Sequence, residues 1–169
     1  MILTNNQIAE IKGAIASSLE LVYEHDNHLI NINAHERTIV FWFGLYFLKI
    51  IENTSFSKDA VLSIDVEYNR DKDKAKKLQG FNAPQRVIPD LILHHRGSND
   101  RNIVVIEFKG HWNQLESDKE KLEKFTNQSG DYQYGLGAFI KLGKTINECE
   151  IVYYKNGGIC RTPCECRTP

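Results

Sequence analysis

Two short hydrophobic runs, each with one acid inside it, constrain this chain more than any other feature. Residues 87–94 contain Asp90, and residues 102–110 contain Glu107. Both runs have the length, the β-branched residues and the flanking turn formers of buried strands. A buried carboxylate without a partner is costly because it loses its hydration. The sequence therefore predicts two buried strands whose acids must be compensated.

A divalent metal ion would compensate both acids at once. Carboxylates on neighbouring strands can share one hard cation, with waters as the remaining ligands. Because side chains alternate along a strand, Glu107 and Lys109 point to one face and Phe108 to the other. Lys109 could then reach a water or phosphate beside the metal. This arrangement suits metal-assisted hydrolysis of a phosphodiester.

The same residues carry a resemblance to a known family. Pro89-Asp90, a gap of 16 residues, and Glu107-Phe108-Lys109 resemble the PD-(D/E)XK motif of the restriction-endonuclease-like nuclease superfamily. The resemblance extends over roughly residues 33–142. It implies an α/β fold in which helices flank a mixed β-sheet, with an α-β-β-β-α-β core and here an extra N-terminal helix.

The resemblance also implies roles for individual residues. Asp90 and Glu107 would bind Mg²⁺, or Mn²⁺ in its place, and the backbone carbonyl of Phe108 would complete the protein ligands. Lys109 would orient or deprotonate the attacking water. Glu36 would contribute from the first core helix, as an acid there often does in that superfamily.

Helical periodicity precedes the strands. Residues 4–24 form one expected helix and residues 33–52 a second, in which Glu36, Val40 and Phe43 lie on one face. Glu36 could reach the metal site from this face. It could equally cap its own helix, where an acid in the first turn suits the helix dipole. Both interpretations stay open.

The remaining pattern completes a single expected domain over residues 1–155. A strand is expected at 60–68, then a polar arm at 70–86, a charged and mostly solvated helix at 116–127, and strands at 134–142 and 150–154. Residues 156–169 are expected to form a disordered tail. The tail contains Cys160, Cys164 and Cys166. Together with Cys149, these cysteines could have no function, form a disulfide or a reactive thiol, or hold part of a zinc site.

Charge limits how the chain could bind nucleic acid. With a net charge of −1, attraction to DNA must come from a local patch. Residues 70–77 are the candidate, through Arg70, Lys72, Lys74, Lys76 and Lys77. A solvated surface is the alternative interpretation of this charge run.

The expected function is a magnesium-dependent deoxyribonuclease, an endonuclease rather than an exonuclease. The start of the chain lacks a secretory pattern, and the apolar run at 39–48 is too short to cross a membrane, so a cytoplasmic protein without membrane contact is expected. Cutting both DNA strands would need two sites, and so a homodimer. The alternative is a catalytically silent member of the same fold that acts as a binding or assembly module.

Overall fold

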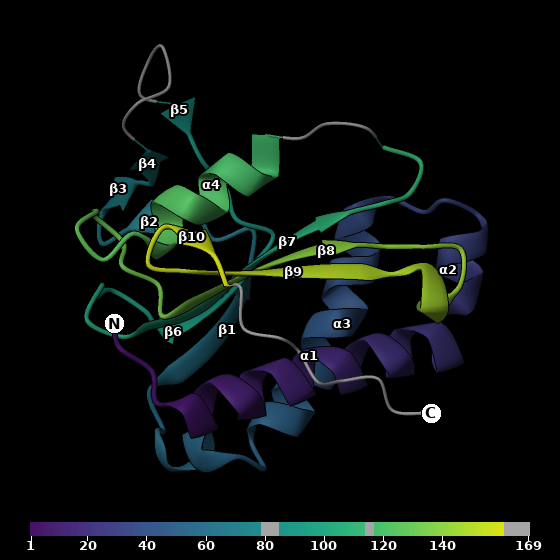
Figure 1. Ribbon diagram of the computed structural model, residues 1–169, viewed down its shortest axis with the longest axis horizontal. Helices are drawn as coiled ribbons and strands as arrows, with labels where there is room; N and C mark the ends of the chain where they lie inside the picture. The colour runs from purple at the N-terminus through teal and green to yellow at the C-terminus, as the bar shows by residue number, and fades with distance from the viewer. Residues whose placement is uncertain (79–84, 114–116, 161–169) are drawn as a thin grey trace.

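A six-stranded mixed sheet between two layers of helices forms the body of the molecule (Figure 1). The computed structural model describes residues 1–78, 85–113 and 117–160. In order across the sheet, the strands are β1 (Leu62–Val66), β6 (Leu91–His95), β7 (Asn102–Lys109), β8 (Leu136–Lys141), β9 (Glu150–Lys155) and β10 (Gly158–Ile159). Strands β7 and β8 run parallel, and the other neighbours run antiparallel. The expected α/β class with a mixed sheet is confirmed.

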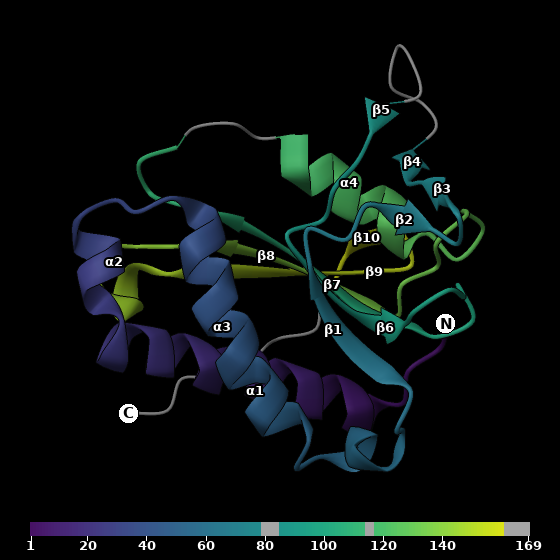
Figure 2. The same ribbon diagram turned by 180° about the vertical axis from the view of Figure 1, so that it is seen from behind.

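The helices divide between the two faces of the sheet. Helices α1 (Asn5–His25) and α3 (Glu36–Ile51) cover one face, and α4 (Ser117–Thr126) covers the other (Figures 1 and 2). Thr4 and Gln7 form a capping box that starts α1, as the sequence predicts. A short helix, α2 (Asn27–Asn31), lies between the two expected helices, and single 3₁₀ turns occur at η1 (Ser55–Lys58) and η2 (Ile146–Glu148).

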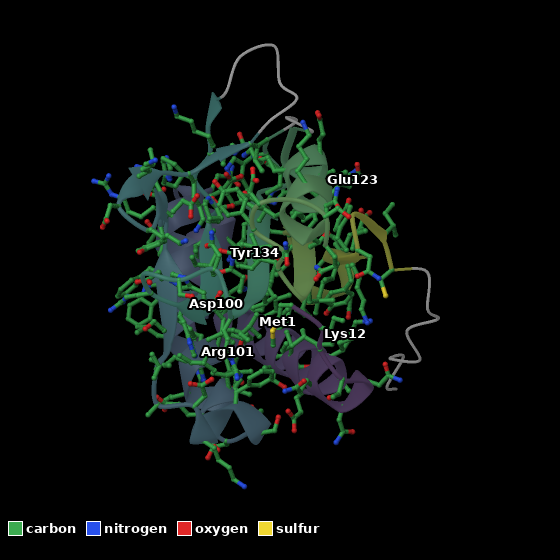
Figure 3. The ribbon with its side chains drawn as sticks, turned by 90° about the vertical axis from the view of Figure 1, so that its left-hand side faces the viewer. Met1, Lys12, Asp100, Arg101, Glu123 and Tyr134 are labelled. Atoms are coloured by element: carbon green, nitrogen blue, oxygen red, sulfur yellow. The ribbon has the colours of Figure 1, made fainter. Side chains whose placement is uncertain are left out.

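Alternation along β7 decides which layer receives each side chain. Val104, Ile106 and Phe108 belong to the core formed with α1 and α3. Val105 belongs to the smaller core under α4. Glu107 follows Val105 in this alternation, so its carboxyl group enters the layer between the sheet and α4. In the side-chain view, the buried Tyr134 lies near the middle of the molecule, with Glu123 of α4 above it and Lys12 of α1 below it (Figure 3).

The polar arm forms two small antiparallel ladders. Strands β2 (Arg70–Asp71) and β3 (Lys74–Ala75) form the first, and β4 (Lys77–Leu78) and β5 (Gln85–Arg86) form the second. Arg70, Lys72, Lys74 and Lys77 are exposed on this arm.

Lys76 corrects the expectation that the whole charge run faces solvent. It is only 2% exposed, and its ammonium group donates to the Tyr134 hydroxyl at 3.3 Å. The rings of Tyr68 and Tyr132 lie 4.9 and 5.7 Å from the same nitrogen. Burial lowers the pKa of Lys76 to about 8. Lys76 therefore anchors the arm to the body and is not available to contact phosphate.

The end of the chain differs from its expected boundary. The sheet continues through β10 to Ile159, past residue 155. Cys149 and Cys160 form no disulfide with each other, and Cys164 and Cys166 lie outside the described residues. Among the described helices, none combines the length and the apolar character needed to cross a membrane.

Candidate active site

Asp90 is held at the start of the central strands by two backbone contacts. It lies one residue before β6, where a position inside the strand was expected. Its carboxylate accepts a hydrogen bond from the Phe108 amide at 2.7 Å, and its carbonyl accepts one from the Glu67 amide at 3.1 Å. The first bond fixes the carboxylate beside the segment that carries Glu107 and Lys109.

Glu107 is the most deeply buried acid of the site. It is 1% exposed and lies beside Asp90, whose carboxylate accepts from the amide of the next residue, Phe108. Its Oε1 atom is buried without a hydrogen-bond partner among the described residues. Burial and the neighbouring Asp90 raise the pKa of Glu107 well above its usual range. Burial likewise raises the pKa of Asp90 to about 6.

Lys109 and Glu36 meet at the same end of the sheet. The Lys109 ammonium lies 3.0 Å from Asp118 Oδ2 and 3.8 Å from Glu36 Oε2. Glu36 Oε1 accepts hydrogen bonds from the Gly110 amide at 2.7 Å and from the Asn113 side chain at 2.8 Å. His35 instead caps α3, accepting from the Arg37 amide at 3.3 Å. Glu36 therefore faces the site and not the amides of its own helix.

Helix α4 contributes two residues that the sequence pattern did not single out. Asp118 is 5% exposed and binds both lysines, with Lys121 Nζ 2.6 Å from its Oδ1 atom. Lys121 Nζ also lies 4.0 Å from Glu107 Oε2. The site thus contains four carboxylates and two ammonium groups drawn from both helical layers.

The chemistry of the acid pair fits a hard divalent cation. Burial raises the pKa of both carboxyl groups, and the charge of Asp90 raises that of Glu107 further; Glu107 Oε1 has no hydrogen-bond partner among the described residues. A divalent cation accepts oxygen ligands of this kind and offsets their charge. Across the described ranges, no three or more His, Cys, Asp or Glu side chains form a ready-made metal cluster. The fit therefore rests on the Asp90–Glu107 pair, to which the Phe108 carbonyl could add a third oxygen.

Three histidines near the acid-bearing strands have other contacts. His94 binds Asp65 at 2.9 Å and His95 binds Asp59 at 3.0 Å, both toward the β1 edge of the sheet. His111 packs edge-to-face against Trp112. Ion pairs thus account for His94 and His95, whereas His111 Nδ1 is buried without a hydrogen-bond partner among the described residues.

No family model matches the chain, and neither the curated proteins nor the solved structures gave a match to it.

Proposed function

We propose that this chain is a metal-dependent nuclease that hydrolyses phosphodiester bonds, with DNA as its substrate. The observation that carries the proposal is the buried Glu107 carboxyl group beside Asp90, which accepts from the Phe108 amide, with Lys109 and Glu36 at the same end of the sheet. The order of helix, three strands, helix and strand around this site supports a restriction-endonuclease-like core.

Asp90, Glu107 and the Phe108 carbonyl would hold Mg²⁺ or Mn²⁺. When bound, this ion would polarise the phosphate and lower the pKa of a coordinated water. The chain's own part is to fix the geometry, since the Phe108 amide orients Asp90 and the β7 ladder orients Glu107. Low dielectric around Glu107 strengthens the interactions of its charged form with a cation.

Lys109 would bind a phosphate oxygen or take a proton from the attacking water. Burial opposes its charge, but the hydrogen bond to Asp118 and the charge of Glu36 raise the pKa of Lys109 above its usual value. The residue is therefore cationic at neutral pH, which favours phosphate binding and water orientation over proton abstraction in the metal-free site. Glu36 would position this lysine and the 110–113 turn.

Incubation with plasmid, linear duplex and single-stranded DNA tests the proposal directly. We expect cleavage with Mg²⁺ or Mn²⁺ and none with EDTA, and we expect Lys109→Met to abolish it while Lys119→Met does not. Lys119 is the matched control, because it is exposed on α4 and lies over the Phe139 ring, 5.4 Å from its centre. Equal, metal-independent products from both variants would identify a contaminating nuclease and reject the proposal.

A second candidate function is a catalytically silent binding module of the same fold. It is favoured by one observation: Lys109 is engaged by Asp118 and Glu36 and not by the Asp90–Glu107 pair. A silent module would bind DNA with equal affinity in EDTA and in Mg²⁺, and would leave every substrate intact.

A second copy of the chain is the partner that double-strand cleavage would need. Helix α3 exposes four large apolar side chains that could contact it: Phe41, Trp42, Leu45 and Leu48. Sedimentation velocity tests whether the chain forms this homodimer. We also propose that the protein is located in the cytoplasm.

A further inference from the structure

The charges of the site leave room for one divalent cation. When ionised, the acids supply four negative charges from Glu36, Asp90, Glu107 and Asp118, and Lys109 and Lys121 return two positive ones. A single ion such as Mn²⁺ would neutralise the residual charge of minus two. Without Lys121, one divalent cation would not neutralise the site.

Lys121 is the cation nearest to the acid pair. Within the described residues, it is the only lysine or arginine that lies within 4.0 Å of a Glu107 oxygen. That distance is too long for a hydrogen bond, so Lys121 offsets the charge of Glu107 without occupying its oxygens. Glu107 Oε1 has no hydrogen-bond partner in the described parts of the chain.

Asp118 holds Lys121 in this place. The 2.6 Å contact between Lys121 Nζ and Asp118 Oδ1 spans one turn of α4, and Asp118 is itself buried. The ammonium group is thus held beside the acid pair by a buried carboxylate. Other lysines of α4 differ, because Lys119 lies over the Phe139 ring and Lys124 pairs with Glu120.

We propose that Lys121 is an internal counter-ion that competes with the divalent cation for the Asp90–Glu107 pair and so sets the metal concentration at which the site fills. The proposal rests on the nuclease function above, and it gives the chain a built-in control of that site. A divalent cation between the carboxylates repels a tethered ammonium a few ångströms away, because Coulomb interactions are weakly screened in a buried site. Metal binding must therefore displace Lys121 from Glu107 or overcome its repulsion.

Calorimetric titration of the metal-free protein with Mn²⁺ at pH 7 tests this competition without any measurement of cleavage. Lys121→Met removes the charge and keeps most of the apolar stem, and Lys119→Met makes the same charge change on an exposed part of the same helix. We expect Lys121→Met to lower the Mn²⁺ dissociation constant about tenfold or more relative to Lys119→Met. Lys121→Arg, which keeps the charge, should stay near the wild-type value.

Each other result decides against one of the two proposals. Equal dissociation constants for Lys121→Met and Lys119→Met, or weaker binding by Lys121→Met, would overturn the counter-ion role while leaving the metal site in place. Absence of Mn²⁺ binding in the wild-type protein and in all variants would instead reject the metal-dependent function itself. If Lys121→Met does not fold, Lys121→Gln supplies the same comparison.

Discussion

Asp65 and the Asp90–Glu107 pair lie on one face of the sheet, but they differ in their hydrogen-bond partners and in the direction of their pKa shifts. Asp65 on β1 lies opposite Ile92 and accepts hydrogen bonds from Arg96 Nε at 2.8 Å, Arg96 Nη2 at 2.6 Å and His94 Nε2 at 2.9 Å. Burial would raise the pKa of Asp65, but these partners hold it below its usual value. At the far end of the same layer, Asp90 and Glu107 have raised pKa values and one oxygen without a partner.

The difference shows that partners, and not burial alone, decide what an inward acid does. Asp65 is complete, because donors from a neighbouring strand and the turn after it neutralise its charge. The Asp90–Glu107 pair is incomplete, because its nearest cation neither touches Glu107 nor satisfies its oxygens. A completed ion pair stabilises the fold, whereas an incomplete one costs stability and leaves a position for a ligand.

The largest expected effect separates the two groups by activity. Glu107→Gln should reduce metal-dependent cleavage by about 10²-fold or more, since it removes charge that the bound cation needs while keeping the shape. Asp65→Asn should leave the rate at saturating DNA within about threefold of wild type. Steady-state cleavage of one duplex substrate measures both. Similar rates for the two variants would remove the distinction between the groups.

The same two variants should change stability with opposite signs. Asp65→Asn should lower the free energy of unfolding by roughly 1–3 kcal/mol, because it removes the negative charge and one of the two acceptor oxygens that serve Arg96 and His94. Glu107→Gln should raise that free energy in EDTA at pH 7.5, because it replaces a charge that burial disfavours. Urea denaturation followed by circular dichroism measures both changes. Destabilisation by Glu107→Gln would mean that the pair is already compensated.

The pH dependence of stability should also divide the two groups. The pKa of Asp90 is raised from 3.8 to about 6, so between these values the folded chain holds a proton that the unfolded chain has lost. This contribution makes the metal-free protein less stable as the pH rises through that window. Asp65 contributes with the opposite sign, because its lowered pKa means that its stabilisation is lost as the pH falls below the unfolded value.

Thermal melts in EDTA at pH 4.5, 5.5, 6.5 and 7.5 separate these contributions. The difference in melting temperature between Glu107→Gln and wild type should grow in favour of the variant as the pH rises. Added Mn²⁺ should reverse that difference by stabilising only the wild-type protein. A difference that is constant across the four pH values would contradict the raised pKa values.

The smallest expected effect concerns DNA binding by the arm. Replacing the exposed Lys72, Lys74 and Lys77 with Ala should flatten the slope of log affinity against log salt by up to about 2–3 units if all three touch phosphate. Cleavage at saturating DNA should persist, since none of the three belongs to the acid–lysine cluster. Fluorescence anisotropy at several salt concentrations measures the slope. An unchanged slope would identify this surface as merely solvated.

The sequence could predict the central residues of the site because strand periodicity is strict. Asp90 and Glu107 stand in or beside short apolar runs, and alternation places Glu107 and Lys109 on one face. Glu36 followed from helical spacing with Val40 and Phe43, which are buried in the core as that spacing requires.

Three inward-facing residues could not be predicted, because their local sequence is typical of an exposed surface. Asp118 and Lys121 lie in a run of alternating charge, which normally indicates a solvated helix face, and only the tertiary placement of α4 turns them inward. Lys76 stands among exposed basic residues. The one sequence signal of its burial is the apolar Leu78 two positions later, because side chains two apart in an extended segment point the same way.

The position of a bound cation tests the account most directly. Crystals soaked in Mn²⁺ and measured at the manganese absorption edge would give an anomalous peak wherever the ion lies. We predict one peak per chain, in contact with the carboxylates of both Asp90 and Glu107, which disappears in Glu107→Gln. A peak elsewhere, or none between these carboxylates in the wild-type protein, would contradict the proposal that Asp90 and Glu107 bind a divalent cation.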